Sequence, residues 1–152
     1  MRRLMRVILV MLLGLGPTSA FAGPAEEASA TIDRWAAAYT ANDIDAIVKL
    51  YASDALLHGT SSPTLNAGTA AIRSYFGRLP GSGNKVTIKE RRMIALGESA
   101  AVGVGFYEFV SLQDGKPVAR PARFTMVIVK SGGGWLIAHH HSSALPPRPR
   151  AQ

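Results

Sequence analysis

The residues best suited to chemistry lie in the last third of the chain. Three consecutive histidines, His139 to His141, follow Trp135 and precede Ser142, while Glu108 and Arg123 lie upstream in apolar segments. An imidazole can serve as a general base or donate a hydrogen bond near neutral pH. A glutamate in an apolar site can also accept a proton, and an arginine buried in a sheet needs a carboxylate or another anion as partner. These residue types predict a site for a small polar or acidic molecule.

Other chemistries lack the residues they need. The 152 residues contain no cysteine, which excludes disulfides, thiol nucleophiles, iron–sulfur clusters and cysteine-ligated zinc. No phosphate-binding loop, dinucleotide fingerprint or serine-hydrolase elbow is present in the sequence, so no cofactor is expected. His139 and His141 share the two-residue spacing of one strand face, but no carboxylate is predicted beside them, so no metal site is expected.

The elements that position these residues are extended segments joined by short turns. Asp114-Gly115 favours a tight hairpin turn, because both central positions of such a turn prefer a positive φ. Short links of this kind predict an antiparallel meander. The expected strands cover residues 85–96, 99–112, 117–130 and 135–143.

Counting outward from the turns assigns side chains to faces. A two-residue turn at Asp114-Gly115 places Phe106 opposite Arg123. A tight turn between Ser131 and Gly134 places Thr125 opposite His140 and Arg123 opposite Ser142. A slip of one residue would put His139 and His141 on this face instead of His140. The expected ligand-binding face carries Phe106, Glu108, Arg123, Thr125, His140 and Ser142, with His58 at its mouth.

The opposite face, with Tyr107, Phe124 and Trp135, is apolar as well. Helices can cover one face of a sheet only, and soluble monomers rarely expose a large apolar face. The sequence therefore predicts a homodimer or a higher homo-oligomer, with the Tyr107/Phe124/Trp135 face as the subunit interface.

Apolar residues at helical spacing dominate the region before the strands. Ile32, Trp35 and Tyr39 lie on one face of a helix over residues 25–40, and Trp35 is expected to pack in the core. A second helix follows Asn42 and ends at Tyr51, which is also expected to pack in the core, and a third helix begins near Thr69. Helices followed by a sheet predict an α+β domain, with the helices packed on one sheet face. The domain is expected to span residues 23–146, and residues 147–152 form a Pro/Arg tail that is expected to be disordered.

The first 22 residues are typical of a cleavable signal peptide. Arg2, Arg3 and Arg6 precede a short apolar stretch, and Ala20-Phe21-Ala22 ends in a small–x–small cleavage pattern. Cleavage after Ala22 would give a periplasmic or secreted protein with no membrane segment. It would also remove three arginines, so the 17 basic residues fall to 14 against 10 acidic ones. The initial net charge of +7 therefore does not indicate a nucleic-acid partner.

Several segments resemble a known family. The ending with Gly134-Trp135, His139 to His141, Ser142-Ser143 and Pro146 resembles the association domain of calcium/calmodulin-dependent protein kinase II, and more closely its stand-alone bacterial relatives. The order of three helices and an antiparallel sheet resembles the nuclear transport factor 2-like, SnoaL-like cone. The resemblance implies a cone-shaped cavity and assembly into rings. It also implies an arginine-lined pocket, but two of its positions fall on Ser142 and Glu108, which leaves Arg123 as the expected pocket arginine.

Three functions remain open at this point. The leading hypothesis is an exported, homo-oligomerising protein that binds a small acidic or polar-aromatic molecule. The second is a cofactor-independent enzyme similar to ketosteroid isomerases and polyketide cyclases, with Glu108 or His140 as general base. The third is a purely structural oligomerisation module. A fold shared by all three does not decide among them.

Overall fold

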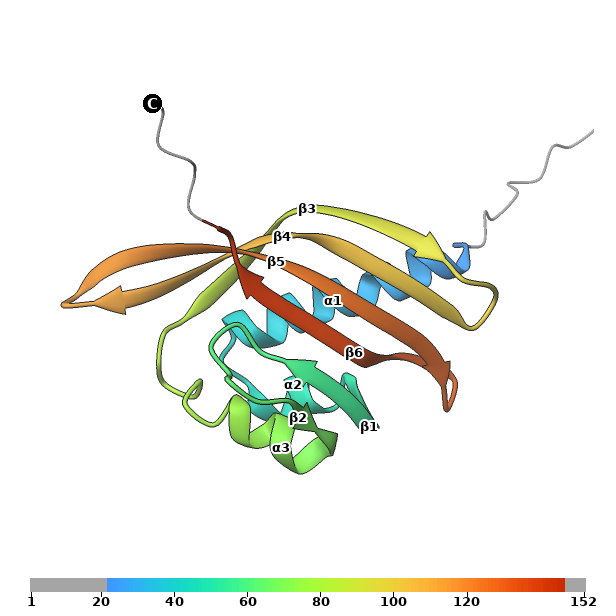
Figure 1. Ribbon diagram of the computed structural model, residues 1–152, viewed down its shortest axis with the longest axis horizontal. Coiled ribbons are helices and arrows are strands. Elements are labelled where there is room, and N and C mark those ends of the chain that lie inside the picture. The colour runs from blue at the N-terminus through green and yellow to red at the C-terminus, as the bar shows by residue number, and fades with distance from the viewer. Residues whose placement is uncertain (1–21, 147–152) are drawn as a thin grey trace, which may run out of the picture.

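The N-terminal helix α1 (Pro24–Thr40) forms as the apolar spacing predicts, and it buries Ile32 and Trp35. The structure, a computed structural model, describes residues 22–146 (Figure 1). The expected leader, apart from Ala22, and the expected tail lie outside these residues. Within the described chain, no helix is long and apolar enough to cross a membrane. The remaining helices are α2 (Ile44–Val48) and α3 (Gly68–Tyr75).

The sheet has six strands in the order β2-β1-β6-β5-β4-β3. The expected meander is present, but the sheet is mixed, because β1 pairs in parallel with β6. Tyr51, expected at the end of the second helix, instead begins β1. The strands are β1 (Tyr51–His58), β2 (Asn66–Ala67), β3 (Lys85–Ala95), β4 (Ala100–Gln113), β5 (Lys116–Ser131) and β6 (Gly134–Ala144).

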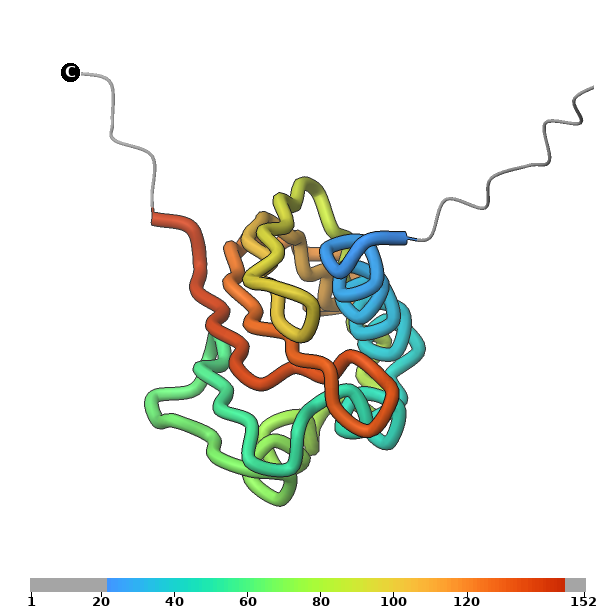
Figure 2. Tube along the Cα trace, turned by 90° about the vertical axis from the view of Figure 1, so that its right-hand side faces the viewer, coloured from blue at the N-terminus to red at the C-terminus, as the bar shows by residue number. Residues whose placement is uncertain are grey.

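The sheet curves around α1, which lies along its concave side (Figures 1 and 2). We call this side the inner face and the convex side the outer face. Two glycines of β4 allow α1 and the neighbouring strand β3 to pack closely against this strand. A Cβ on Gly103 would lie 2.6 Å from Ile32 Cδ1, and one on Gly105 would lie 2.1 Å from the Glu90 carbonyl oxygen. Side chains at these positions would collide with the helix or with the neighbouring strand.

The predicted register of the central hairpin is confirmed. Gln113 pairs with Lys116, and Phe106 pairs with Arg123. The next hairpin also starts as expected, with Ser131 opposite Gly134, but β6 then carries one extra residue at Ala138. The register shifts between the pairs Ile128–Ile137 and Val127–His139.

This β-bulge corrects the predicted faces. Arg123 lies opposite Ser143, not Ser142, and Thr125 lies opposite His141, not His140. His140 and Ser142 therefore share the inner face with Tyr107, Phe124 and Trp135. The prediction that His140 and Arg123 lie on one face is wrong, because the inserted residue reverses the alternation of all later side chains in the strand.

Candidate functional site

The inner face, α1, α3 and the loop after β1 enclose a cavity of about 670 Å³, which we call the inner cavity. Its size falls in the usual range for small-molecule sites. Its walls are mainly aromatic and aliphatic, with polar side chains placed among them. The lining residues include Trp35, Tyr39, Leu57, Thr60, Ser61, Tyr75, Phe76, Arg78, Tyr107, Phe109, Arg120, His140, Ser142 and Leu145.

His140 lies at the centre of a buried hydrogen-bond chain on one wall of this cavity. Its Nδ1 lies 2.8 Å from the Tyr51 hydroxyl, and that hydroxyl accepts a hydrogen bond of 3.0 Å from Trp35 Nε1. The Trp35 ring also packs edge-on against the imidazole, at a centroid distance of 5.1 Å. All three side chains are almost fully buried. The imidazole is therefore fixed in orientation by groups from α1 and β1.

The chain continues from His140 toward solvent. His140 Nε2 lies 3.5 Å from the Tyr107 hydroxyl, which donates to Ser142 Oγ, and Ser142 Oγ is hydrogen-bonded to Thr60 Oγ1. Thr60 is partly exposed and belongs to the loop after β1. Together these contacts link six side chains, which we call the relay: Trp35, Tyr51, His140, Tyr107, Ser142 and Thr60.

Burial keeps the relay uncharged. Burial lowers the pKa of His140 to about 3, helped by the neighbouring His139 and His141. Burial likewise raises the pKa of Tyr51 and of Tyr107 well above the ordinary tyrosine value. Within residues 22–146, no buried side-chain nitrogen or oxygen lacks a hydrogen-bond partner. At neutral pH the relay is therefore a neutral network in which each buried polar side-chain atom has a hydrogen-bond partner.

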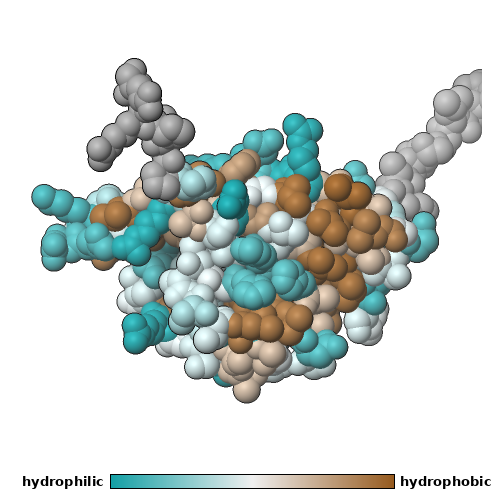
Figure 3. Space-filling model, viewed as in Figure 1, coloured by the Kyte–Doolittle hydropathy of each residue, from teal (hydrophilic) through white to brown (hydrophobic). Residues whose placement is uncertain are grey.

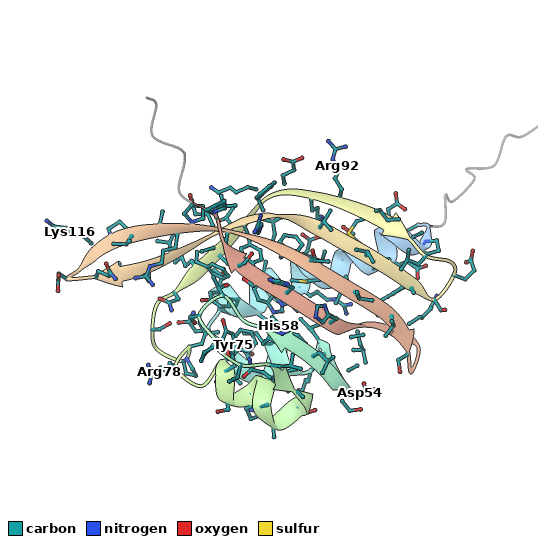
Figure 4. The ribbon with its side chains drawn as sticks, in the orientation of Figure 1. Asp54, His58, Tyr75, Arg78, Arg92 and Lys116 are labelled. Atoms are coloured by element: carbon teal, nitrogen blue, oxygen red, sulfur yellow. The ribbon has the colours of Figure 1, made fainter. Side chains whose placement is uncertain are left out.

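Positive charge lies where the cavity opens. Arg78 and Arg120 line it and are exposed, whereas no Asp or Glu of the described chain does so. Figure 4 shows Tyr75 and Arg78 on the side of the molecule toward which the β4–β5 hairpin projects. The inner cavity therefore runs from a neutral, apolar interior to a cationic mouth.

The other predicted site residues lie on the outer face. Arg123, Phe106 and Thr125 line a second hollow of about 420 Å³, the outer groove, together with Arg92 and His141. Arg123 is exposed, and its Nε donates to Ser143 Oγ over 3.0 Å. The expectation of a buried Arg123 is therefore wrong. Glu108 is also directed outward and forms an ion pair of 3.0 Å with Lys89, not with Arg123.

His58 lies on the outer face and not at the cavity mouth. It pairs with His141 across the β1–β6 ladder, and its ring centroid lies 5.6 Å from that of His141 and 5.9 Å from that of His139. Across the described residues, no group of three potential ligands has the geometry of a metal site. The inner cavity thus brings together His140 and Ser142 of the predicted set, while the outer face holds Arg123, Phe106, Thr125, Glu108 and His58.

Sequence reasoning missed most of the inner site. It assigns Trp35 and Tyr51 to core packing, Tyr107 to the subunit interface, and Thr60, Arg78 and Arg120 to no site. One clue is available: a buried tryptophan or tyrosine needs a partner for its N–H or O–H. The expected subunit interface on the Tyr107/Phe124/Trp135 face is also wrong, because α1 covers that face and Trp35 stacks on Tyr107 at 6.0 Å.

Comparison with known proteins agrees with this architecture. A model of the SnoaL-like domain family matches residues 28–147. A solved structure from Xanthomonas campestris, described as a calcium/calmodulin-dependent protein kinase II association domain, is 34% identical, with a TM-score of 0.76. The match covers 90% of this chain and 99% of that one. Among curated proteins, no match was found.

More distant structures share the fold alone. A ketosteroid isomerase-like protein from Erwinia carotovora atroseptica is 19% identical with a TM-score of 0.69, over 84% of this chain and 100% of that one. A protein from Novosphingobium aromaticivorans described as a scytalone dehydratase is 11% identical with a TM-score of 0.71, over 83% and 93%. The family match covers most of the chain and the Xanthomonas relative covers nearly all of it. This protein belongs to the SnoaL-like domain family, with the nuclear transport factor 2-like fold.

Proposed function

We propose that this protein binds a small aromatic carboxylate in the inner cavity and works as an exported, homo-oligomeric binding protein. The observation that carries the ligand class is the lining of the cavity. Its walls combine aromatic rings with a neutral relay, and its charged residues, within the described chain, are Arg78 and Arg120 at the mouth. An aromatic body gains free energy from burial against such walls, and a carboxylate at the exposed end gains from the arginines.

The binding test compares two ligands of one shape. 2-Naphthoate carries the carboxylate, and 2-naphthamide replaces it with a neutral amide. We expect naphthoate to bind more tightly, and Arg120→Ala or Arg78→Ala to weaken it by about fivefold, because a partly exposed charge contact contributes about 1 kcal/mol. Isothermal titration calorimetry measures both affinities.

Arg123→Ala is the matched control, since it removes the same charge from the outer groove. It should leave the affinity for naphthoate unchanged. A loss in Arg123→Ala, with Arg78→Ala and Arg120→Ala unaffected, would move the site to the outer groove. No binding of either ligand to the wild-type protein would contradict the proposed function.

Catalysis is the second candidate, but it has less support. Glu108, one of the two proposed general bases, lies on the outer face beside Lys89 and away from the inner cavity. His140 does face the cavity, yet its Nδ1 is occupied by the Tyr51 hydroxyl. An enzyme using His140 would therefore have to act through the relay, whereas binding requires no further group.

Homo-oligomerisation is supported by the outer face. Leu56, Ile94 and Phe106 on this face are 39%, 55% and 41% exposed. Figure 3 shows apolar surface gathered over the right-hand half of the sheet. The face also carries both signs of charge, with Glu90 and Arg92 near Phe106 in the outer groove, which suits contact with a second copy. We therefore place the subunit interface here, on the side opposite to the one expected from the sequence.

Analytical ultracentrifugation tests this interface. The wild-type protein at micromolar concentration should sediment as a dimer or larger species, and Phe106→Asp should shift it toward the monomer. A pure wild-type monomer would contradict the proposal.

Export rests on the first 22 residues, and N-terminal sequencing of the protein from a secreting host should find Gly23 as the first residue.

A further inference from the structure

The relay has a direction that its donors and acceptors fix. The indole Nε1–H of Trp35 is a donor only, so the Tyr51 oxygen must accept from it. Tyr51 then has one hydrogen left to donate. Within the described chain, the remaining hydrogen-bond partner of that hydroxyl is His140 Nδ1, at 2.8 Å. Tyr51 therefore donates to Nδ1, and His140 carries its proton on Nε2.

The opposite tautomer is disfavoured by the same accounting. With the proton on Nδ1, His140 would donate to the Tyr51 oxygen, and the Tyr51 hydrogen would have no acceptor among the described residues. Tyr51 is 5% exposed and packs in the core, away from bulk water. A buried, unsatisfied donor biases the two arrangements by about tenfold or more.

The proton on His140 Nε2 also determines which group donates at each later hydrogen bond of the relay. His140 Nε2–H points toward the Tyr107 oxygen, and Tyr107 donates to Ser142 Oγ. Ser142 Oγ accepts from Tyr107, and the remaining partner of the Ser142 hydroxyl hydrogen among the described contacts is Thr60 Oγ1, so Ser142 donates to Thr60. Thr60 is the last member and lines the inner cavity. Among the described side chains, its hydroxyl hydrogen has no acceptor other than the nearby Tyr107 oxygen, which already accepts from His140.

We propose that the relay presents the Thr60 hydroxyl hydrogen to the inner cavity, so that the site selects ligands with a carbonyl or carboxylate oxygen at this point. This inference rests on the proposed ligand binding and adds a recognition element to it. A ligand that offers only an N–H donor there would face a second donor. Thr60 is the specificity-determining residue, and Trp35 and His140 are positioning residues that act through it.

Two measurements test the proposal. The first needs no ligand: ¹⁵N NMR of the wild-type protein at neutral pH reports the tautomer of His140. A neutral ring with the proton on Nε2 is expected. A proton on Nδ1, or a doubly protonated ring, would overturn the direction of the relay.

The second measurement uses two probes of one shape. 2-Acetylnaphthalene carries a carbonyl oxygen where 2-isopropenylnaphthalene carries a methylene group. We expect the wild-type protein to bind the ketone about tenfold more tightly. Thr60→Val should abolish this preference and leave the affinity for the alkene unchanged, and Thr60→Ser should keep it. Thr64→Val, the same substitution at an exposed position of the same loop that does not line the cavity, should not affect the preference.

The outcomes separate this proposal from the function it rests on. Binding of both probes with equal affinity to the wild-type protein, or a preference that survives Thr60→Val, would overturn the selection by Thr60 while leaving ligand binding intact. Failure of both probes and of 2-naphthoate to bind would overturn the proposed function and this selectivity together, and the His140 tautomer would still decide the direction of the relay.

Discussion

Three consecutive histidines experience opposite environments on the two faces of one sheet. His140 on the inner face is 1% exposed and is hydrogen-bonded within the relay. His139 and His141 point to the outer face, where their rings lie near that of His58. Burial lowers the pKa of His140 to about 3. The pKa of His139 is also lowered, first by burial and then by the neighbouring His58 and His141, but His139 is much less buried than His140.

The two faces differ in the same way in their charges. The inner cavity places neutral polar groups in an aromatic wall, with Arg78 and Arg120 at its mouth. Elsewhere on the inner face, Arg91 and Lys130 form ion pairs with Asp33 and Glu27 of α1. The outer face carries Glu90, Arg92, Glu108 and Arg123, at partly or fully exposed positions. In Figure 4, Arg92 points away from the sheet on this side. The comparison shows that burial in the inner cavity, and not the residue type, decides whether a polar side chain here is neutral and fixed or charged and solvated.

The largest effect is expected where the inner face tolerates no added atom. Gly105→Ala places a Cβ 2.1 Å from the Glu90 carbonyl oxygen and 2.9 Å from Phe124 Cζ. The backbone of β3 must shift, so we expect a loss of about 3 kcal/mol or more in the free energy of unfolding, measured by urea denaturation. Gly134→Ala is the control, because its Cβ meets nothing within 4 Å. Equal stability of the two variants would contradict the packing described here.

The pH dependence of stability should come from the inner histidine. The pKa of His140 is about 3 in the folded state, against 6.5 for an unperturbed histidine side chain. Between these two values the unfolded chain therefore binds a proton that the folded chain does not. The free energy of unfolding should fall as the pH drops below about 6.5, by up to about 1.4 kcal/mol per pH unit. Urea denaturation of the wild type, His140→Gln and His141→Gln between pH 7 and pH 4 measures this contribution.

His140→Gln should reduce the slope, and His141→Gln should retain it. The comparison between the two variants removes the contribution of the carboxylates, which is common to both. If His141→Gln reduced the slope as much as His140→Gln, the two faces would not differ in the way proposed.

A smaller change in stability is expected from substitutions of the adjacent residues Phe106 and Tyr107, which lie on opposite faces of β4. Tyr107→Phe removes the hydroxyl that links His140 to Ser142 and should cost about 1–2 kcal/mol in the free energy of unfolding. Phe106→Tyr adds a hydroxyl to a side chain that is 41% exposed on the outer face, and should change stability by less than about 0.5 kcal/mol. Thermal unfolding under one set of conditions compares both with the wild type. A larger loss of stability in Phe106→Tyr than in Tyr107→Phe would contradict the assignment of Tyr107 to the inner face and Phe106 to the outer face.

The smallest effect is expected at Arg123. Arg123→Ala removes an exposed side chain whose hydrogen-bond partner is Ser143, so stability should stay within about 0.5 kcal/mol of the wild type. Calorimetry at dilutions below the association range separates this from any change in assembly. A loss above about 2 kcal/mol would show that the arginine is buried, as the sequence alone predicts.

The sequence predicted the local features of the fold well. The apolar spacing around Trp35 indicates the first helix, and Asp114-Gly115 indicates the register of the central hairpin, because such turns constrain their neighbours through backbone geometry. The parallel pairing of β1 with β6 was missed, since it joins residues far apart in sequence. The bulge was missed because Ala138 is not a residue that favours a bulge, so nothing at that position distinguishes it from its neighbours.

The site was predicted less well for the same reason. Its residue types were found, but their grouping depended on the register of β6. Thr60 comes from a loop whose position is fixed only by the tertiary fold, and the polar role of Tyr51 depends on Trp35 and His140 meeting it in the core. Contacts of this kind arise from packing and not from spacing along the chain.

The extra residue at Ala138 also governs how this protein can be compared with its relatives. Deleting Ala138 would leave the composition of the strand almost unchanged, yet it would exchange His140 for its two neighbours on the cavity wall. In an alignment, the same event is a gap of one position. A residue downstream of such a gap would keep its column but move from pocket to surface, so the role of His140 carries over to a relative only where the relative has the bulge as well.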